Sequence, residues 1–418
     1  MKVVGLITEY NPFHLGHKYH LNMSKKLTNS DYSIAVMSGS FVQRGEPSLI
    51  DKWTKAKMAI DNGVDLVIEL PFIFSTQSAE LFAYGSIALL HNLSIVDCVA
   101  FGSELGSLDY LNEIAEILVY EPPHYKENLR KYLNEGNSFS VSRSNALQDY
   151  FEKFNVNKKY NISIKDLLKM SNNILAIEYL KALKILNSKI QPVAIKRIGS
   201  SYNENQLNHK IASATGIRKK IINGNIEATR KHITNQTYDH LINYINKYKK
   251  FNMLDNYTQI IHYLLRIGHI NNLIQIMDVE SGLENRITKK STKYSDINDL
   301  IQAISTKRYP KTRIQRILIH LMANLTKPIF RELYPHYPCY IRVLGSNEKG
   351  FVLLNKIKEE SKLPIIMKFS DHVKYKDLYL QKIIEFDKKA TDLFFLGLNT
   401  PNPFMDMDYY TTPYIKKK

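Results

Sequence analysis

The residues best suited to chemistry are two histidines, His14 and His17, separated by Leu15 and Gly16. They follow a short apolar run over residues 3–7 and precede apolar residues with helical spacing over 17–27. That order predicts a strand, a turn and a helix. The glycine lets a phosphate chain approach the backbone, and the helix start offers free N–H groups and a positive dipole end. The two imidazoles share one side of the first helical turn, where they can donate hydrogen bonds to phosphate oxygens. We therefore predict an ATP site at which attack on the α-phosphate releases pyrophosphate, with no protein nucleophile.

Two other interpretations of these histidines stay open. They could cap the helix or lie at the surface without a catalytic role. His14, His17 and His20 also step by three, which is compatible with a zinc site, but no cysteine and no pair of carboxylates stands nearby to complete a tetrahedral set. We predict no metal held by the protein itself.

Short apolar segments alternate with amphipathic ones over the first hundred residues. The predicted strands span 3–8, 32–37, 66–70 and 95–101, and the predicted helices span 17–27, 52–61, 79–90 and 108–118. Near-continuous apolar strands separated by helices are typical of a parallel sheet covered on both faces. The expected fold is a doubly wound (Rossmann-like) α/β domain, whose ligand lies beyond the carboxyl ends of the strands. Turns containing Gly and Ser at 37–40 and 101–104 would share that edge with the histidine turn.

The rest of the chain is predicted to be largely helical and then mixed. Residues 121–170 have a polar helical pattern with a break at Pro122-Pro123, and Ser171-Asn172 could cap a helix over 174–186. A strand is expected at 192–198, helices over 225–330, and strands at 340–344 and 364–367. We expect three parts: a catalytic domain over 1–222, a helical basic region over 223–335, and a small α/β C-terminal region over 336–418.

Composition places the chain among globular proteins of a reducing compartment. Its 418 residues are 44% hydrophobic and 11% aromatic, enough for a sizeable core. Cys98 and Cys339 cannot form a disulfide framework. The N-terminus turns polar at Thr8 and Glu9, and no apolar run approaches the length of a membrane span. We expect a cytoplasmic protein without a membrane partner, and no stable protein partner is predicted.

The charge is unevenly spread along the chain. Residues 1–150 hold 12 Lys+Arg and 17 Asp+Glu, whereas the remainder holds 45 and 23. An excess of this size favours a polyanionic partner such as nucleic acid, although biased composition would also produce solvated lysines. Arg313 and Arg316 are three apart and would share a helical face, which suits RNA phosphates; the alternative is a solvated amphipathic helix. The candidate RNA-binding residues are Lys307, Arg308, Lys311, Arg313 and Arg316.

A second group of residues able to contact phosphate follows residue 212. Ser213 and Thr215 stand at the predicted start of a helix, and Arg218 lies one turn further on. Hydroxyls at that position cap the helix and can touch phosphate, while the arginine can clamp the β- or γ-phosphate. Together with the histidine turn, these residues are similar to the signatures of the HxGH nucleotidyltransferase superfamily.

Taken in order, the motifs resemble the tRNA(Met) cytidine acetate ligase family of bacteria over nearly the whole chain. The family more often has Asn where this chain has Leu15, a position that varies across the superfamily. The segments that carry the resemblance are GLITEYNPFHLGH at 5–17, MSGSFVQRGEP at 37–47, FGSE at 101–104, SNNILAIEY at 171–179 and SATGIR at 213–218.

The resemblance implies a two-step reaction. Acetate and ATP would give acetyl-adenylate and pyrophosphate, and we expect Mg²⁺ to help stabilise the charge on the phosphoryl oxygens. The acetyl group would then pass to the exocyclic amine of the wobble cytidine of elongator tRNA(Met), giving N(4)-acetylcytidine. His14, His17 and Arg218 would be the catalytic residues. The expected ATP-binding residues are Ile7, Thr8, Glu9, Tyr10, Asn11, Pro12, Phe13, His14, Leu15, Gly16, His17, Lys18, Tyr19, His20, Gly102, Asn172, Arg197, Ser213 and Thr215.

Two other functions would use the same motifs. A small-molecule adenylyltransferase of cofactor biosynthesis would not need the large basic extension. A non-catalytic RNA-binding protein on the same scaffold would not need an intact histidine pair together with Arg218.

Overall fold

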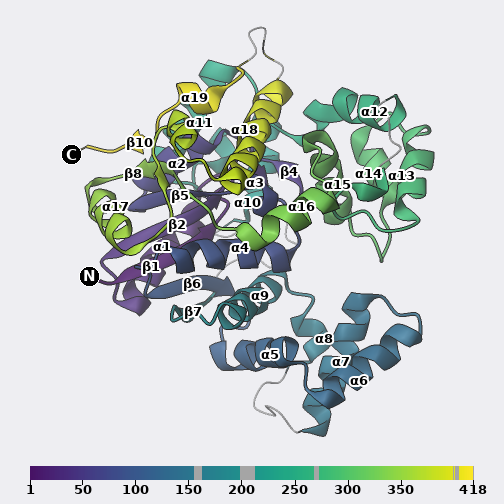
Figure 1. Cartoon of the computed structure of the whole chain (residues 1–418). Coiled ribbons are helices and arrows are strands. Elements are labelled where there is room, and N and C mark those ends of the chain that lie inside the picture. The colour runs from purple at the N-terminus through teal and green to yellow at the C-terminus, as the bar shows by residue number, and fades with distance from the viewer. Residues whose placement is uncertain (155–161, 198–211, 268–272, 399, 401–403, 418) are drawn as a thin grey trace.

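The computed structural model describes residues 1–154, 162–197, 212–267, 273–398, 400 and 404–417. Within them the chain forms a sheet of eight strands, a separate two-stranded hairpin, and helices that cover the sheet or stand beside it (Figure 1). The strands are β1 (Val3–Thr8), β2 (Tyr32–Ser38), β3 (Phe41–Val42), β4 (Glu46–Pro47), β5 (Leu66–Leu70), β6 (Cys98–Ser103), β7 (Gln191–Lys196), β8 (Ile341–Ser346), β9 (Ile365–Ile366) and β10 (Tyr414–Ile415).

The helices fall into two sets along the chain. Those before β7 are α1 (Leu15–Thr28), α2 (Lys52–Asp61), α3 (Phe72–Ser75), α4 (Ala79–Asn92), α5 (Leu108–Tyr120), α6 (Pro123–Asn134), α7 (Phe139–Lys153), α8 (Ile164–Leu167) and α9 (Ser171–Ile185). Those after it are α10 (Ala214–Ile222), α11 (Asn235–Tyr248), α12 (Thr258–Arg266), α13 (Leu283–Ser291), α14 (Ile297–Ile304), α15 (Lys311–Ala323), α16 (Lys327–Leu333), α17 (Glu348–Glu360), α18 (Leu378–Leu398) and α19 (Met407–Tyr410). Short 3₁₀ helices occur at η1 (Glu227–Thr229), η2 (Leu254–Tyr257), η3 (Leu273–Gln275), η4 (Tyr334–His336) and η5 (Phe369–Lys374).

The strand order explains where a ligand can bind. Across the sheet the order is β10-β8-β5-β2-β1-β6-β7, with β9 paired to β8. The chain runs from β1 to β2 and β5 in one direction and then returns to β6 and β7 on the other side of β1. The order therefore reverses between β1 and β6, and ligands of open α/β sheets bind at such a switch point, beyond the carboxyl ends of the strands.

The central strands are apolar because both of their faces are covered. Val3, Leu6, Ile34 and Ile68 are fully buried. Right-handed crossovers place α1 and α2 on one face of the sheet and α4 and α9 on the other. Gly5 lets α4 approach β1 closely, since a Cβ there would lie 2.9 Å from the Leu90 side chain.

The doubly wound fold predicted from the sequence is confirmed, with corrections at particular elements. The predicted cap at Ser171-Asn172 is wrong, because α9 already begins at Ser171 and Met170 is its N-cap. Pro122 and Pro123 open α6. Ile198, the last residue of the strand predicted at 192–198, lies outside the described residues.

The C-terminal region does not form a sheet of its own. Strand β8 pairs antiparallel with β5, and β10 pairs with β8, so this region extends the sheet of the first 222 residues. The predicted division at residues 223 and 336 stays a prediction. Figure 1 shows two groups of helices standing to one side of the sheet, α6–α8 below and α12–α14 above. No helix among the described residues is long and apolar enough to cross a membrane.

Candidate active site

The two histidines lie at the start of α1, beyond the carboxyl end of β1. His14 is the N-cap residue: its Nδ1 accepts a hydrogen bond from the Gly16 amide at 3.0 Å. The Nδ1 of His17 accepts one from the His14 amide at 3.3 Å, which completes a capping box built from two imidazoles. The rings stack with their centroids 3.8 Å apart. The capping role that the sequence left open is therefore present, and the two rings lie side by side.

This cap determines which ring nitrogen carries the proton. Because Nδ1 of each ring accepts from a backbone amide, a neutral ring carries its hydrogen on Nε2. Burial, together with the charges of Arg197 and Arg218, lowers the pKa of His14 to about 3. Burial also lowers the pKa of His17 well below its usual value, and the nearby His14 adds to the effect. At neutral pH both side chains are uncharged Nε2–H donors.

The backbone at the start of α1 differs from the expectation. The Leu15 amide donates to the carbonyl of His232 at 3.0 Å, and the Gly16 amide is taken by His14. The prediction of free N–H groups in this first turn is wrong at these two positions, because a distant segment and the cap satisfy them. A phosphate here would meet imidazole Nε2–H groups and the field of the helix dipole.

The ends of β6 and β7 place a second group of predicted residues together. Arg197 follows β7 and donates from Nη1 to Oδ1 of Asn172 at 3.3 Å. A Cβ on Gly102 would lie 3.3 Å from the Arg197 side chain, so the glycine leaves room for the arginine stem. Asn172 also donates to Glu104 at 2.6 Å.

The neighbouring Asn173 has a structural role. It is fully buried, and its Oδ1 accepts from the Ser103 hydroxyl and from the amides of Glu104 and Leu105 at 2.8, 3.0 and 3.1 Å. Asn173 thus holds the turn after β6, while Asn172 is the one of the pair that contacts Arg197.

Helix α10 brings the third group to the loop after β1. Ser213 caps the helix by accepting from the Gly216 amide at 3.2 Å. Arg218 donates to the Asn11 carbonyl at 3.0 Å and to Thr215 at 3.4 Å, and pairs with Glu46 at 3.6 Å. The guanidinium of Arg218 therefore lies against the segment that leads into His14, although the two motifs are about two hundred residues apart.

A buried lysine supports this loop. Nζ of Lys55, on α2, donates to the carbonyls of Ser38 and Gly39 at 2.7 and 2.8 Å and to the Glu9 carbonyl at 3.3 Å. Burial lowers the pKa of Lys55 to about 7. Lys55 was not among the residues predicted from the sequence. A signal was present, because Lys55 shares the apolar side of the predicted helix with Ala56 and Ala59.

Not every residue of the predicted ATP segment has its side chain at this edge. Lys18 donates to the carbonyl of Asn62 at 2.6 Å, at the end of α2. Tyr10 and Phe13 are buried, and both rings pack against His17, with centroids 5.0 and 5.6 Å from its ring. These aromatic rings orient the imidazole.

The chain is similar to known proteins over nearly its whole length. A family model described as HIGH Nucleotidyl Transferase matches residues 1–406. A tRNA(Met) cytidine acetate ligase of Thermoanaerobacter sp. (strain X514) is 48% identical over 95% of this chain and 96% of its own. One from Clostridium perfringens (strain SM101 / Type A) is 42% identical over 99% and 100%. The crystal structure of Thermotoga maritima TmcAL bound with alpha-thio ATP superposes with a TM-score of 0.91 at 32% identity, covering 99% of both chains.

The chain belongs to the tRNA(Met) cytidine acetate ligase family.

In this family member, the candidate RNA-binding residues differ in their surroundings: two contact Asp278 and three are exposed. Arg316 is buried and donates to an Asp278 carboxylate oxygen at 2.7 Å, and Arg313 donates twice to the Asp278 carbonyl, at 2.8 and 3.0 Å. The two arginines do share a face of α15, but that face is turned to the segment before α13. Both guanidinium groups hold the turn at Asp278, so they are not the solvated face that the sequence suggested, and their role in RNA binding stays a prediction.

The other three candidates are exposed. Lys307, Arg308 and Lys311 all lie at the surface, although Arg308 also pairs with Glu280 at 2.9 Å. For these three residues, RNA binding stays a prediction. In the described part of the chain, no group of three or more His, Cys, Asp or Glu side chains could hold a metal ion.

Proposed function

We propose that this chain activates acetate with ATP to acetyl-adenylate and transfers the acetyl group to the wobble cytidine of elongator tRNA(Met), forming N(4)-acetylcytidine. The proposal agrees with the family to which the chain belongs. The observation that carries it is the stacked pair His14 and His17, whose Nε2–H donors stand at the switch point of the sheet.

In the first step, a carboxylate oxygen of acetate attacks the α-phosphorus of ATP. The new bond is the mixed anhydride P–O bond, and the bond to the bridging oxygen breaks, so pyrophosphate leaves with the electron pair. Negative charge develops on the phosphoryl oxygens. His14 and His17 donate neutral hydrogen bonds to these oxygens, and Arg197 and Arg218 supply positive charge from two other elements.

Mg²⁺ would enter with ATP as part of the substrate. Glu9 and Glu46 are already engaged, by the Gln43 amide at 3.0 Å and by Arg218 at 3.6 Å, so the phosphates and water would supply most ligands. The ion would add positive charge at the triphosphate.

In the second step, the exocyclic amine of the cytidine attacks the acetyl carbonyl. A C–N bond forms, AMP leaves, and the amine loses a proton. The anhydride is reactive, so positioning of the unstacked base supplies much of the rate. The basic second half of the chain, with Lys307, Arg308 and Lys311, would bind the tRNA backbone.

The decisive experiment is incubation with ATP, labelled acetate and total tRNA, followed by nucleoside analysis. We expect labelled N(4)-acetylcytidine and acetate-dependent ATP–pyrophosphate exchange. A small-molecule adenylyltransferase would not require tRNA or acetate, and a non-catalytic RNA-binding protein would show no exchange. Folded protein that gives no acetate-dependent exchange at any Mg²⁺ concentration would overturn the proposal.

The His17→Ala variant separates the two halves of the function. It removes an Nε2–H donor from the ATP site and touches no exposed lysine. We expect loss of adenylate formation with nearly unchanged tRNA affinity. If folded His17→Ala protein no longer binds tRNA, the two functions are not separated as proposed.

A further inference from the structure

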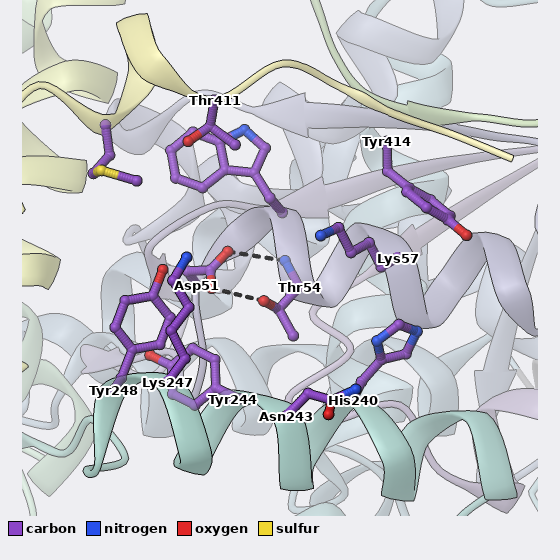
Figure 2. A pocket seen from close by; sticks show the side chains of 12 residues that line it. Asp51, Thr54, Lys57, His240, Asn243, Tyr244, Lys247, Tyr248, Thr411 and Tyr414 are labelled. Atoms are coloured by element: carbon purple, nitrogen blue, oxygen red, sulfur yellow. Dashed lines mark hydrogen bonds between the residues drawn. The ribbon is translucent and has the colours of Figure 1, made fainter.

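A pocket of about 350 Å³ lies away from the histidine turn, between α2, α11 and the C-terminal segment (Figure 2). Asp51, Trp53, Thr54 and Lys57 line it from α2 and its N-cap, and Tyr244, Lys247 and Tyr248 line it from α11. Thr411 and Tyr414 close it from the C-terminal side. None of these residues takes part in the proposed reaction.

The pocket has two lysines without a carboxylate partner. Neither Lys57 nor Lys247 forms an ion pair with any described residue, in contrast to many other lysines of the chain. Each instead lies over an aromatic ring: Lys57 is 5.8 Å from the ring centre of Tyr414, and Lys247 is 4.7 Å from that of Tyr248. The pocket's carboxylate, Asp51, accepts from the amide and hydroxyl of Thr54 at 2.9 and 2.7 Å.

A buried donor in the same pocket also lacks a partner. Trp53 is only 3% exposed, and its Nε1–H makes no hydrogen bond to a described residue. A buried donor without an acceptor is costly, so such groups are rare unless a ligand or water satisfies them. The pocket therefore offers two ammonium groups and aromatic walls, and the unpaired indole N–H is buried within its lining. That combination suits a ligand with both an anionic group and a flat ring.

We propose that this pocket binds a nucleotide, with the phosphate at Lys57 and Lys247 and the base against the aromatic side chains. Stacking on aromatic rings combined with lysine–phosphate contacts is how proteins hold single-stranded nucleic acid. The nucleotide comes from the tRNA substrate, and this assignment of the source rests on the proposed function.

Helix α11 gives the spacing between the pocket and the catalytic turn. The segment just before α11 contacts α1 through the bond from the Leu15 amide to the His232 carbonyl. From there α11 runs for 14 residues, roughly 20 Å at 1.5 Å per residue, and its residues from His240 to Tyr248 line the pocket, whose far end lies at that distance along the helix. About six nucleotides at the 3.4 Å spacing of a stacked strand cover that distance. One RNA strand can therefore place its reacting cytidine in the ATP site and another nucleotide here.

The chain provides its own probe, because Trp53 is its single tryptophan. We expect tRNA(Met) to change the Trp53 fluorescence of the full-length protein. The variant Lys57→Met with Lys247→Met keeps the apolar stems and removes both charges. It should bind tRNA about tenfold more weakly, with the slope of log affinity against log salt lower by about 1. Its acetate-dependent ATP–pyrophosphate exchange should be unchanged.

The matched control removes two exposed lysines outside the pocket, Lys358 and Lys362, near the end of α17. The variant Lys358→Met with Lys362→Met loses the same charge and should bind tRNA as the unchanged protein does. Equal weakening in both double variants, or no weakening in either, overturns the pocket proposal. If the unchanged protein shows no acetate-dependent ATP–pyrophosphate exchange, the proposed function fails and not the pocket proposal.

A mononucleotide titration separates the two sources of the ligand. Cytidine monophosphate and AMP are added to the unchanged protein and to the Lys57→Met, Lys247→Met variant, with Trp53 fluorescence as the readout. A response to tRNA alone, lost in the variant, supports an RNA nucleotide. A saturable response to a free mononucleotide at micromolar concentration, lost in the variant, overturns the RNA source in favour of a free nucleotide. No response to either ligand overturns the site.

Discussion

His14 has two roles that a single substitution can separate. Its Nδ1 caps α1, and its Nε2–H faces the place proposed for phosphate. The cap is a stability term, since N-cap residues that accept an amide hydrogen bond are worth about 1 kcal/mol over alanine. In the proposed reaction the donor would act on charge that develops in the transition state, so its loss would lower the rate and not the stability.

The variant His14→Asn should keep the cap and lose the donor. Asparagine accepts the Gly16 amide with a short side chain and is a favourable N-cap residue. We expect an exchange rate about a hundredfold lower with an unchanged free energy of unfolding. His14→Ala should lose activity to the same extent and also lose about 1 kcal/mol of stability. Chemical denaturation and exchange assays of both variants test this, and an active His14→Asn protein would contradict it.

The pKa of His14 predicts that the free energy of unfolding depends on pH, and that the unchanged protein and His14→Asn differ in this dependence. The folded pKa of His14, about 3, lies below its unfolded value of 6.5, so the unfolded state binds more protons between these values. The stability that the neutral ring contributes is present above pH 6.5 and is lost as the pH falls. By pH 5 the loss from this one group is about 2 kcal/mol.

Denaturation at pH 7 and pH 5 checks this dependence. Unchanged protein should lose more stability than His14→Asn over that interval. Other groups, such as Asp387, whose pKa burial raises to about 8, titrate in both proteins and cancel in the difference. An identical pH dependence in the two proteins would show that His14 does not titrate as inferred.

At the scale of elements, the β3–β4 hairpin connects the catalytic loop to α15. The Gln43 amide donates to Glu9 at 3.0 Å, and Glu46 accepts from Gln315 of α15 at 3.3 Å. Gly45 has a φ of +74°, and a Cβ there would lie 2.2 Å from the backbone nitrogen of Arg316. The hairpin thus sits directly on the α15 backbone, where only glycine fits.

Replacement of that glycine should separate the hairpin from the helix. Gly45→Ala combines the left-handed strain with a backbone clash, so we expect a stability loss of more than about 2 kcal/mol and a lower exchange rate. Gly224→Ala is the control, because Gly224 has a φ of +78° with nothing within 4 Å of its Cβ position. It should lose only about 1 kcal/mol, without loss of activity. Equal effects of the two substitutions would mean that the contact with α15 is unimportant.

Substitutions of the exposed cations and of the buried cation near the start of α15 should have different effects. Lys307→Ala with Lys311→Ala removes exposed charges, so tRNA binding should weaken and its salt slope should fall by about 2. Arg316→Ala should instead cost about 3 kcal/mol of stability, because it leaves the Asp278 carboxylate uncompensated. Salt-dependent binding and denaturation curves distinguish these outcomes. An unchanged slope for the lysine variant would place the RNA surface elsewhere.

At the scale of the whole molecule, the two ends of the chain are joined in one sheet and one charge cluster. Strand β8 pairs with β5, and Asp408 of α19 pairs with Lys52 of α2 at 2.9 Å. Arg342 lies 3.6 Å from the same carboxylate, and all three side chains are almost fully buried. Lys52 also pairs with Glu69 at 2.9 Å. The last residues therefore stabilise the helix that carries Lys55 beneath the catalytic loop.

Removal of the Asp408 side-chain carboxylate should destabilise the molecule as a whole. Asp408→Ala leaves buried cations short of a partner, so we expect a loss of about 3 kcal/mol. Glu360→Ala breaks the exposed pair with Lys356, at 2.9 Å, and should leave stability almost unchanged because solvent screens this pair. Thermal unfolding of both variants tests the contrast. Asp408→Ala protein as stable as the control would mean that the cluster is held without it.

Much of the catalytic half was predictable because its information is local. The strand 3–8 and the helix 52–61 were predicted with the bounds that the structure has, since apolar runs and helical periodicity depend on neighbouring residues. The positions of the histidine turn and of the turn at 101–104 at one sheet edge followed from the rule for parallel strands. The individual roles proposed for the ATP-binding residues remain predictions.

The sequence by itself determined the strand–turn–helix at His14, the doubly wound fold and the resemblance to one family. Only the tertiary structure decided that Leu15 N–H is occupied by His232, that Arg313 and Arg316 are bound to the Asp278 turn, and that β8 enters the main sheet. The physical reason is sequence separation. Periodicity shows which face of an element is buried, but it does not name the distant residue that meets each polar group there. That pairing is settled by how the elements pack, and it decides which charged groups remain for a ligand.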